Sequence, residues 1–160
     1  DGLLAICFGD GSVALVWGDD YSAMNQIKIA VHTADCFCVR FSPDGRILAT
    51  GGADAQVTLW DCDSTSTLPV PLRCLNRSEW PIRTVSFSYD SQFLAVGTED
   101  TFLAVERVVD GQLVAKIKGR GVPIDCVSWH PNKHIFAFAP EEVDDRTGRF
   151  TGIIKLIGLC

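Results

Sequence analysis

The sequence lacks the features that mark a membrane protein or a nucleic-acid-binding domain. No apolar run approaches the roughly 18 residues that a bilayer-spanning helix needs, and the longest, at 153–160, is interrupted by Lys155 and Gly158. Lys and Arg number 14 against 20 Asp and Glu, a formal net charge of −6. Binding to a phosphate backbone requires a basic surface. We therefore expect no membrane partner, and RNA only as an indirect partner.

The sequence also lacks any Cys-x-x-Cys pair, although it contains 7 cysteines. Most lie in apolar runs, where a thiol behaves as a small buried hydrophobic group, and the odd number favours a reducing compartment over a disulfide framework. Cys36 and Cys38, expected on one face of a strand, lie near His32, but this spacing is not that of a zinc finger. We expect no metal and no cofactor.

Catalytic motifs are missing as well. The chain contains no Gly-x-Ser-x-Gly, His-Glu-x-x-His or Gly-x-x-x-x-Gly-Lys, the motifs of a nucleophile elbow, a zinc protease and a phosphate-binding loop. The paired carboxylates at 19–20 and 144–145 fall in expected turns, where adjacent acids are usually solvated. We predict that the protein is not an enzyme and has no small-molecule substrate.

What the sequence does contain is a repeat. Three similar segments are anchored on Phe41, Phe87 and Trp129, which are 46 and then 42 residues apart. Such a period is typical of four-stranded propeller blades. Short runs rich in Val, Ile, Phe and Leu alternate with turn residues, and no segment has a sustained helical period. The prediction is an all-β propeller with about four blades, at 1–31, 32–76, 77–118 and 119–160.

Turn residues predict where strands reverse. Pro43-Asp44-Gly45 combines a preset φ, a side chain that bonds its own backbone and a residue that tolerates positive φ. Gly9-Asp10-Gly11 does the same between 3–8 and 12–17, which we interpret as a hairpin. The first blade would thus begin at its second strand. We therefore expect the C-terminal half of a larger ring, seven-bladed as in many propellers.

The second repeat contains His32, Thr50 and Asp54 and ends on Trp60-Asp61. It resembles the WD-repeat family, and the resemblance implies a structural hydrogen-bonded chain through His32, Thr50, Asp54 and Trp60. The other repeats depart from this pattern. In the third, an acid stands in place of the tryptophan at position 106, no histidine precedes the first strand, and only the turn aspartate is retained.

Segments outside the generic repeat narrow the resemblance. The core Glu79-Trp80-Pro81-Ile82-Arg83-Thr84, the Trp129-His130-Pro131 triplet and the final blade resemble the WD-repeat subunits of the THO transcription–export complex. The resemblance implies a nuclear, non-catalytic scaffold that supports messenger RNA packaging and export. Its partners would be the other THO and transcription–export subunits.

Two alternatives remain open on the sequence. One is another WD-repeat adaptor, such as a ubiquitin-ligase receptor or a chromatin reader. The other is a propeller that binds RNA directly, for which Lys116, Lys118 and Arg120 along one strand give a weak basis. Lysines on edge strands more often discourage sheet-to-sheet pairing.

Two segments supply candidate partner contacts. Trp80, Pro81 and Arg83 are expected on one face of the ring, because they join two blades. Trp80 is either an exposed anchor, a residue type common at binding hot spots, or a side chain folded between blades. The second segment is a long polar insertion at 140–151, which carries Glu141, Glu142, Asp144, Asp145, Arg146 and Arg149.

Overall fold

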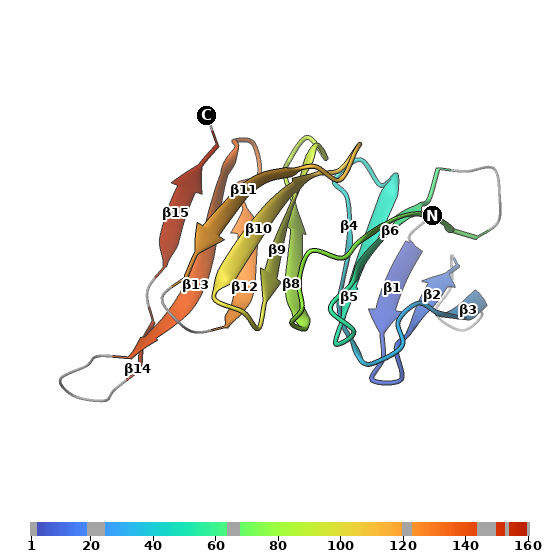
Figure 1. The fold of residues 1–160 in the computed structure, drawn as a ribbon. Coiled ribbons are helices and arrows are strands. Elements are labelled where there is room, and N and C mark those ends of the chain that lie inside the picture. Colours follow the sequence, from blue (N-terminus) through green and yellow to red (C-terminus); the bar gives the residue numbers. More distant parts are fainter. Residues whose placement is uncertain are drawn as a thin grey trace.

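Four antiparallel β-sheets stand side by side in chain order (Figure 1). The computed structural model describes residues 3–18, 25–63, 68–119, 123–143, 150–152 and 154–159. Every regular element in these ranges is a strand, and they include no helix long and apolar enough to cross a membrane. The labelled ends of the chain lie toward opposite ends of the row of sheets.

The first three sheets follow the chain strand by strand. The first has the order β1 (Leu3–Cys7), β2 (Ser12–Trp17), β3 (Asn25–Ala30). The second has the order β4 (Cys36–Phe41), β5 (Ile47–Gly52), β6 (Val57–Asp61), β7 (Val70–Leu75). The third has the order β8 (Ile82–Phe87), β9 (Phe93–Thr98), β10 (Phe102–Arg107), β11 (Leu113–Lys118).

The predicted hairpin at the start of the chain is confirmed, because β1 pairs with β2 from Leu3↔Trp17 to Cys7↔Val13. Its turn ends on Gly11, whose φ of 79° is a conformation that favours glycine. A Cβ at this position would also collide with the backbone carbonyl of His32. Glycine is therefore required there by both conformation and space.

The second and third sheets share one register, displaced by 46 residues. Leu48 pairs with Trp60 in the second sheet and Leu94 with Glu106 in the third. In each, the pairing of the first two strands shifts after its first residue, at Cys36 and at Ile82. Residues of the two blades can therefore be compared position by position.

The turns between the first two strands of these sheets are also alike. The hydroxyl of Ser42 donates to Asp44 Oδ1 (2.6 Å) and accepts the amide of Ile47 (2.9 Å). The same two bonds recur 46 residues later, from Ser88 to Asp90 (2.7 Å) and from Phe93 to Ser88 (2.9 Å). Gly45 has the positive φ predicted for it, 74°. The serine is therefore as much a part of the turn as the aspartate.

The fourth sheet differs from the other blades. It consists of β12 (Ile124–Trp129), β13 (Ile135–Val143), β14 (Phe150–Gly152) and β15 (Lys155–Gly158). Both β14 and β15 pair with β13, at different parts of its length. The described part of this sheet is therefore three strands wide, although it contains four strands. The segment expected as an insertion at 140–151 is strand at both ends, because β13 continues through Val143.

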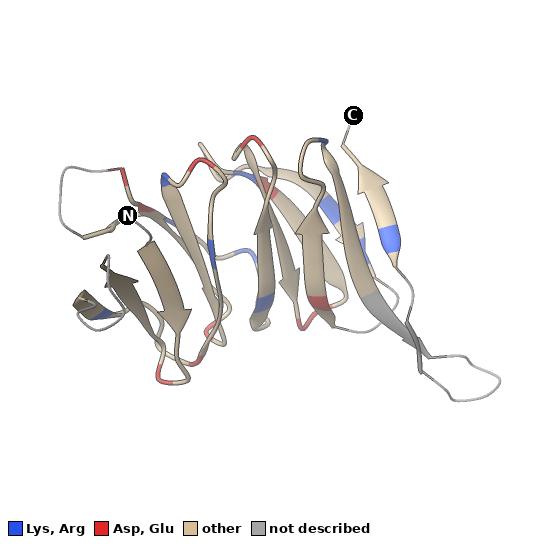
Figure 2. Ribbon diagram, turned by 180° about the vertical axis from the view of Figure 1, so that it is seen from behind, with Lys and Arg blue, Asp and Glu red and all other residues tan. Residues whose placement is uncertain are grey.

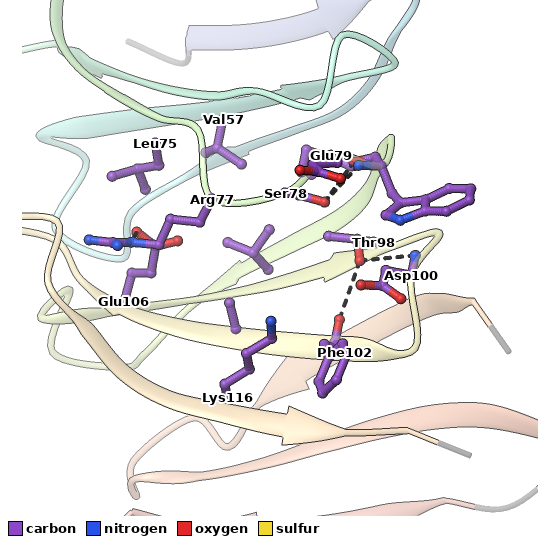
Figure 3. Close-up of a pocket in the computed structure, with 14 residues that line it drawn as sticks. Val57, Leu75, Arg77, Ser78, Glu79, Thr98, Asp100, Phe102, Glu106 and Lys116 are labelled. Atoms are coloured by element: carbon purple, nitrogen blue, oxygen red, sulfur yellow. Dashed lines mark hydrogen bonds and ion pairs between the residues drawn. The ribbon is translucent and has the colours of Figure 1, made fainter. Parts of the chain in front are cut away.

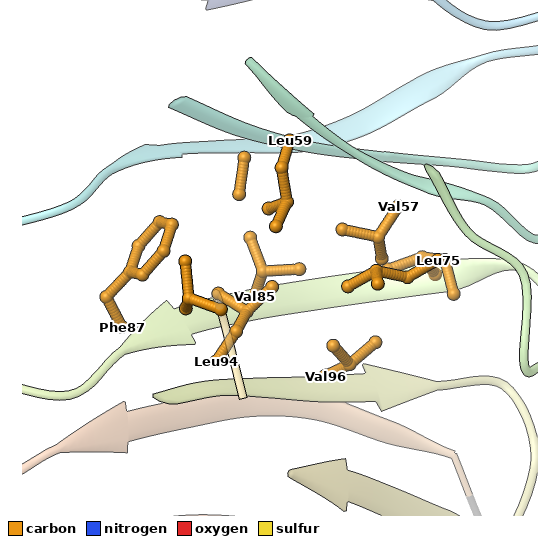
Figure 4. Packing of buried hydrophobic residues seen from close by; sticks show 10 residues of the cluster. Val57, Leu59, Leu75, Val85, Phe87, Leu94 and Val96 are labelled. Carbon is orange, nitrogen blue, oxygen red and sulfur yellow. The ribbon is translucent and has the colours of Figure 1, made fainter. Parts of the chain in front are cut away.

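The hydrophobic core lies between neighbouring sheets, in three separate clusters. The central cluster joins the second sheet, through Val57 and Leu59, to the third, through Val85 and Leu94 (Figure 4). Leu59 and Leu94 are 0% exposed, and burying a leucine side chain stabilises the fold by about 1.5–3 kcal/mol. Each sheet interior is therefore completed by its neighbour.

Polar contacts reinforce the same boundaries. Asp90 Oδ2, in a turn of the third sheet, lies 2.8 Å from Nε2 of His134, which is in the turn between the first two strands of the fourth. In the equivalent turn of the second sheet, the Asp44 amide donates to Ser91 Oγ (3.3 Å). The first strands β4, β8 and β12 also contact one another in order. The sheets are thus joined both through their faces and through their turns.

Candidate protein-interaction site

The second sheet brings its four WD-pattern residues together. His32 Nδ1–H donates to Asp54 Oδ1 (2.9 Å), the Thr50 hydroxyl bonds His32 Nε2 (3.0 Å), and Trp60 Nε1–H donates to Thr50 Oγ1 (3.2 Å). The His32 side chain and Thr50 are both 0% exposed. A buried imidazole, indole and hydroxyl each need a partner. The chain of bonds supplies one to each and ties the segment before β4 to β5 and β6.

The same bonds leave His32 with no free ring nitrogen for a metal. Cys36 and Cys38 do not share a strand face, contrary to expectation. A shift in pairing separates them, so Cys36 joins the cluster toward the first sheet and Cys38 the cluster toward the third. Burial raises the pKa of each thiol to about 12. Across the described ranges, no three His, Cys, Asp or Glu residues are grouped to hold an ion.

The third sheet has lost most of this arrangement. Ser78, Val96 and Glu106 stand 46 residues after the histidine, threonine and tryptophan, and Asp100 retains the aspartate position. The Glu106 side chain is only 3% exposed, and its Oε2 lies 3.3 Å from Arg77 Nε. Burial raises the pKa of the Glu106 carboxyl, and Arg77 opposes the shift. In the third sheet, a buried carboxyl group whose charge is partly balanced by Arg77 therefore stands where the second sheet has an indole.

A cavity of about 290 Å³ occupies the space that these smaller side chains leave (Figure 3). Val57 and Leu75 form its wall on the second sheet, and the connection before β8 borders it. In Figure 3, Arg77 and Glu106 lie together at one end. The other lining residues are Ser78, Glu79, Trp80, Ile82, Val96, Thr98, Asp100, Phe102, Ala104 and Lys116.

Trp80 is exposed. The residue has 52% of its surface exposed. The sequence left two orientations open for its side chain, and the structure has the outward one. The Trp80 amide donates to Ser78 Oγ (3.0 Å), and the Pro81 carbonyl accepts the amide of Glu99 (3.0 Å). The backbone on both sides of the indole is therefore held while its ring faces solvent.

Arg83 is engaged within the molecule. It forms an ion pair with Glu99, and its guanidinium carbon lies 4.7 Å from the centre of the Phe37 ring. Its side chain is nevertheless 40% exposed. Arg83 therefore braces the third sheet against the second and keeps part of its surface available.

The second candidate segment falls mostly outside the described residues. Asp144, Asp145, Arg146 and Arg149 lie there, whereas Glu141 and Glu142 are on β13, paired with Gly152 and Thr151. Of the three cations that suggested RNA binding, Lys116 and Lys118 are exposed on β11, and Arg120 lies outside the described residues. Figure 2 shows Lys and Arg distributed over the sheets.

These sheets, packed face to face with their first strands adjoining, define a β-propeller. The model of the WD domain, G-beta repeat, matches residues 25–61 and 69–105. The first match begins with β3 and the second one residue before β7, each the last strand of a sheet, and each match ends on the third strand of the next sheet, so a repeat crosses a blade boundary. The chain belongs to the WD-repeat β-propeller family.

Individual relatives agree with this assignment. THO complex subunit 3 of Arabidopsis thaliana is 32% identical over 130 residues, which are 81% of this chain and 40% of that protein. WD repeat-containing protein AAC3 of Dictyostelium discoideum is 34% identical over 69% of this chain and 22% of its own length. The β-propeller domain of Myceliophteria thermophila Cps50 (Swd1) superposes with a TM-score of 0.74 at 16% identity, over 95% of this chain and 49% of that one. The chain spans less than half of each of these proteins.

Proposed function

We propose that the protein is a non-catalytic scaffold subunit of a THO-type transcription–export complex in the nucleus. It holds other subunits through protein–protein contacts during messenger RNA packaging and export, and it meets RNA through the complex. The observation that carries the proposal is the similarity to THO complex subunit 3, which covers 81% of the chain. Trp80, Pro81 and Arg83 are the proposed contacts, and the half-exposed indole supports their role.

The test is a native purification of the full-length protein after nuclease treatment, with its partners identified by mass spectrometry. We expect the other THO subunits without RNA. Recovery of ubiquitin-ligase or chromatin subunits instead would overturn the THO assignment and leave the propeller standing. Loss of every partner on nuclease treatment would favour the RNA-binding alternative.

Two matched variants examine the face. Trp80→Ala and Arg83→Ala should reduce subunit recovery, the first more strongly, because Arg83 is partly engaged with Glu99. Tyr89→Ala is the control, since this aromatic residue is 41% exposed and follows the opposite end of β8. Equal losses from Trp80→Ala and Tyr89→Ala would argue against the proposed face.

A further inference from the structure

Asp100 lacks the donor that its counterpart has. In the second sheet, Asp54 accepts the imidazole N–H of His32 at 2.9 Å. Asp100 occupies the equivalent turn, where its Oδ1 accepts the amide of Thr101 (2.6 Å), but Ser78 stands at the histidine position. The Asp100 carboxylate therefore borders a cavity where the second sheet holds a nitrogen donor.

The cations at the cavity already have partners. Arg77 bonds Glu106 through Nε (3.3 Å) and the Gly111 carbonyl through Nη2 (2.7 Å). Lys116 Nζ lies 4.2 Å from the centre of the Phe102 ring. Neither cation forms an ion pair with the Asp100 carboxylate. Both are therefore poorly placed to replace the imidazole that Asp54 has as its donor in the second sheet.

The remaining polar groups favour a cation from outside. Glu79 is exposed, and neither it nor Asp100 forms an ion pair with any residue in the described ranges. Trp80 lines the same cavity and offers the face of a half-exposed indole. Two carboxylates beside an aromatic face suit a planar guanidinium, which donates to carboxylates in pairs and stacks on aromatic rings.

We propose that this cavity binds an arginine side chain from a segment of a partner protein. The guanidinium donates to Asp100 in the position that the imidazole fills in the second sheet, Glu79 provides the second carboxylate, and the arginine stem packs along Trp80. A volume of about 290 Å³ lies at the lower end of the range for small ligand sites and is enough for one side chain. The inference rests on the proposed scaffold function and gives it a recognition chemistry.

The experiment titrates the full-length protein, labelled with 5-fluorotryptophan, with three acetylated five-residue peptides. Their central residue is arginine, citrulline or glutamate between glycines. The fluorine resonance that disappears in Trp80→Phe is assigned to Trp80. We expect it to shift with the arginine peptide, less so at higher salt, and not with the neutral citrulline or the glutamate peptide. A shift with glutamate, or equal shifts with arginine and citrulline, would overturn the proposal.

Two variants locate the contact. Asp100→Asn keeps the acceptor for the Thr101 amide and removes the charge, so we expect affinity for the arginine peptide to fall about tenfold, the usual scale for a charge-assisted hydrogen bond. Asp125→Asn, at an exposed acid on β12, is the control and should leave affinity unchanged. Unchanged affinity in Asp100→Asn would refute the proposed contact.

A third variant closes the cavity. Ser78→His, Val96→Thr and Glu106→Trp together copy the second sheet into the third, and Asp100 is already present. If this protein folds, as its circular dichroism would show, it should no longer respond to the arginine peptide; a retained response would place the site elsewhere. The peptide titration requires no partner subunit. Its failure would therefore leave the THO purification standing, and a failed purification would leave a positive titration standing.

Discussion

Replacing Thr50 with valine removes the central group of the hydrogen-bonded chain. Valine has nearly the same shape, so the change opens no cavity, but the Trp60 indole N–H and the ring nitrogen of His32 lose partners at 3.2 Å and 3.0 Å. Each buried group left without a partner costs about 1–3 kcal/mol. With two such groups, we therefore expect Thr50→Val to lower the free energy of unfolding by about 2–6 kcal/mol.

Urea unfolding of the full-length protein, followed by circular dichroism, measures this loss. Thr84→Val makes the same chemical change on β8, where the threonine hydroxyl has no hydrogen bond to the described residues, and should cost less than about 0.5 kcal/mol. Trp60→Phe should cost less in the Thr50→Val background than alone, because the two residues share a bond. A loss below about 1 kcal/mol for Thr50→Val, or full additivity with Trp60→Phe, would refute the reasoning.

Two further predictions concern buried ionisable groups. The pKa of Glu106 is raised in the folded state, so between pH 4.5 and that folded-state pKa the folded protein holds a proton that the unfolded protein has released. This contribution therefore favours folding at low pH and is lost as pH rises through the folded-state pKa. Glu106→Gln should therefore raise the thermal midpoint at pH 7, with the gain vanishing below about pH 4.5; an equal gain at both pH values would contradict the assignment to ionisation. Cys36, with a pKa of about 12, should resist a maleimide at pH 7 while exposed Cys126 reacts, as mass spectrometry of the labelled peptides would show; equal labelling would mean that Cys36 is not buried.

Local patterns were enough to predict the blades. Alternating apolar residues between turn residues define a strand wherever it packs, and a glycine such as Gly11 or Gly45 is required by backbone geometry alone. The WD pattern also predicted which residues the second sheet brings together, because each of its members has a set position in one blade. The serine of each Ser-x-Asp turn carries a similar local signal, since its spacing to the aspartate recurs at Ser42 and Ser88.

Other features depended on which side chains meet across blades. The pairing shift in β4 separated Cys36 from Cys38, although strict alternation would have kept them on one face. The sequence left two orientations open for the Trp80 side chain. The structure has the outward one, with the backbone on both sides of the residue held by hydrogen bonds. The extension of β13 through Val143 likewise requires a partner strand that the sequence pattern of one strand does not reveal.

The sequence by itself determined a chain of WD-repeat blades, because strand periodicity, turn conformation and the spacing of the hydrogen-bonding residues are properties of short segments. It also showed that the third repeat had lost its histidine and tryptophan. Only the tertiary structure decided what that loss produced: a buried Glu106 held by Arg77, and a cavity beside Asp100 bordered by an exposed indole. The physical reason is that the cavity forms between blades, where its size depends on how completely the side chains of the neighbouring sheets fill the space.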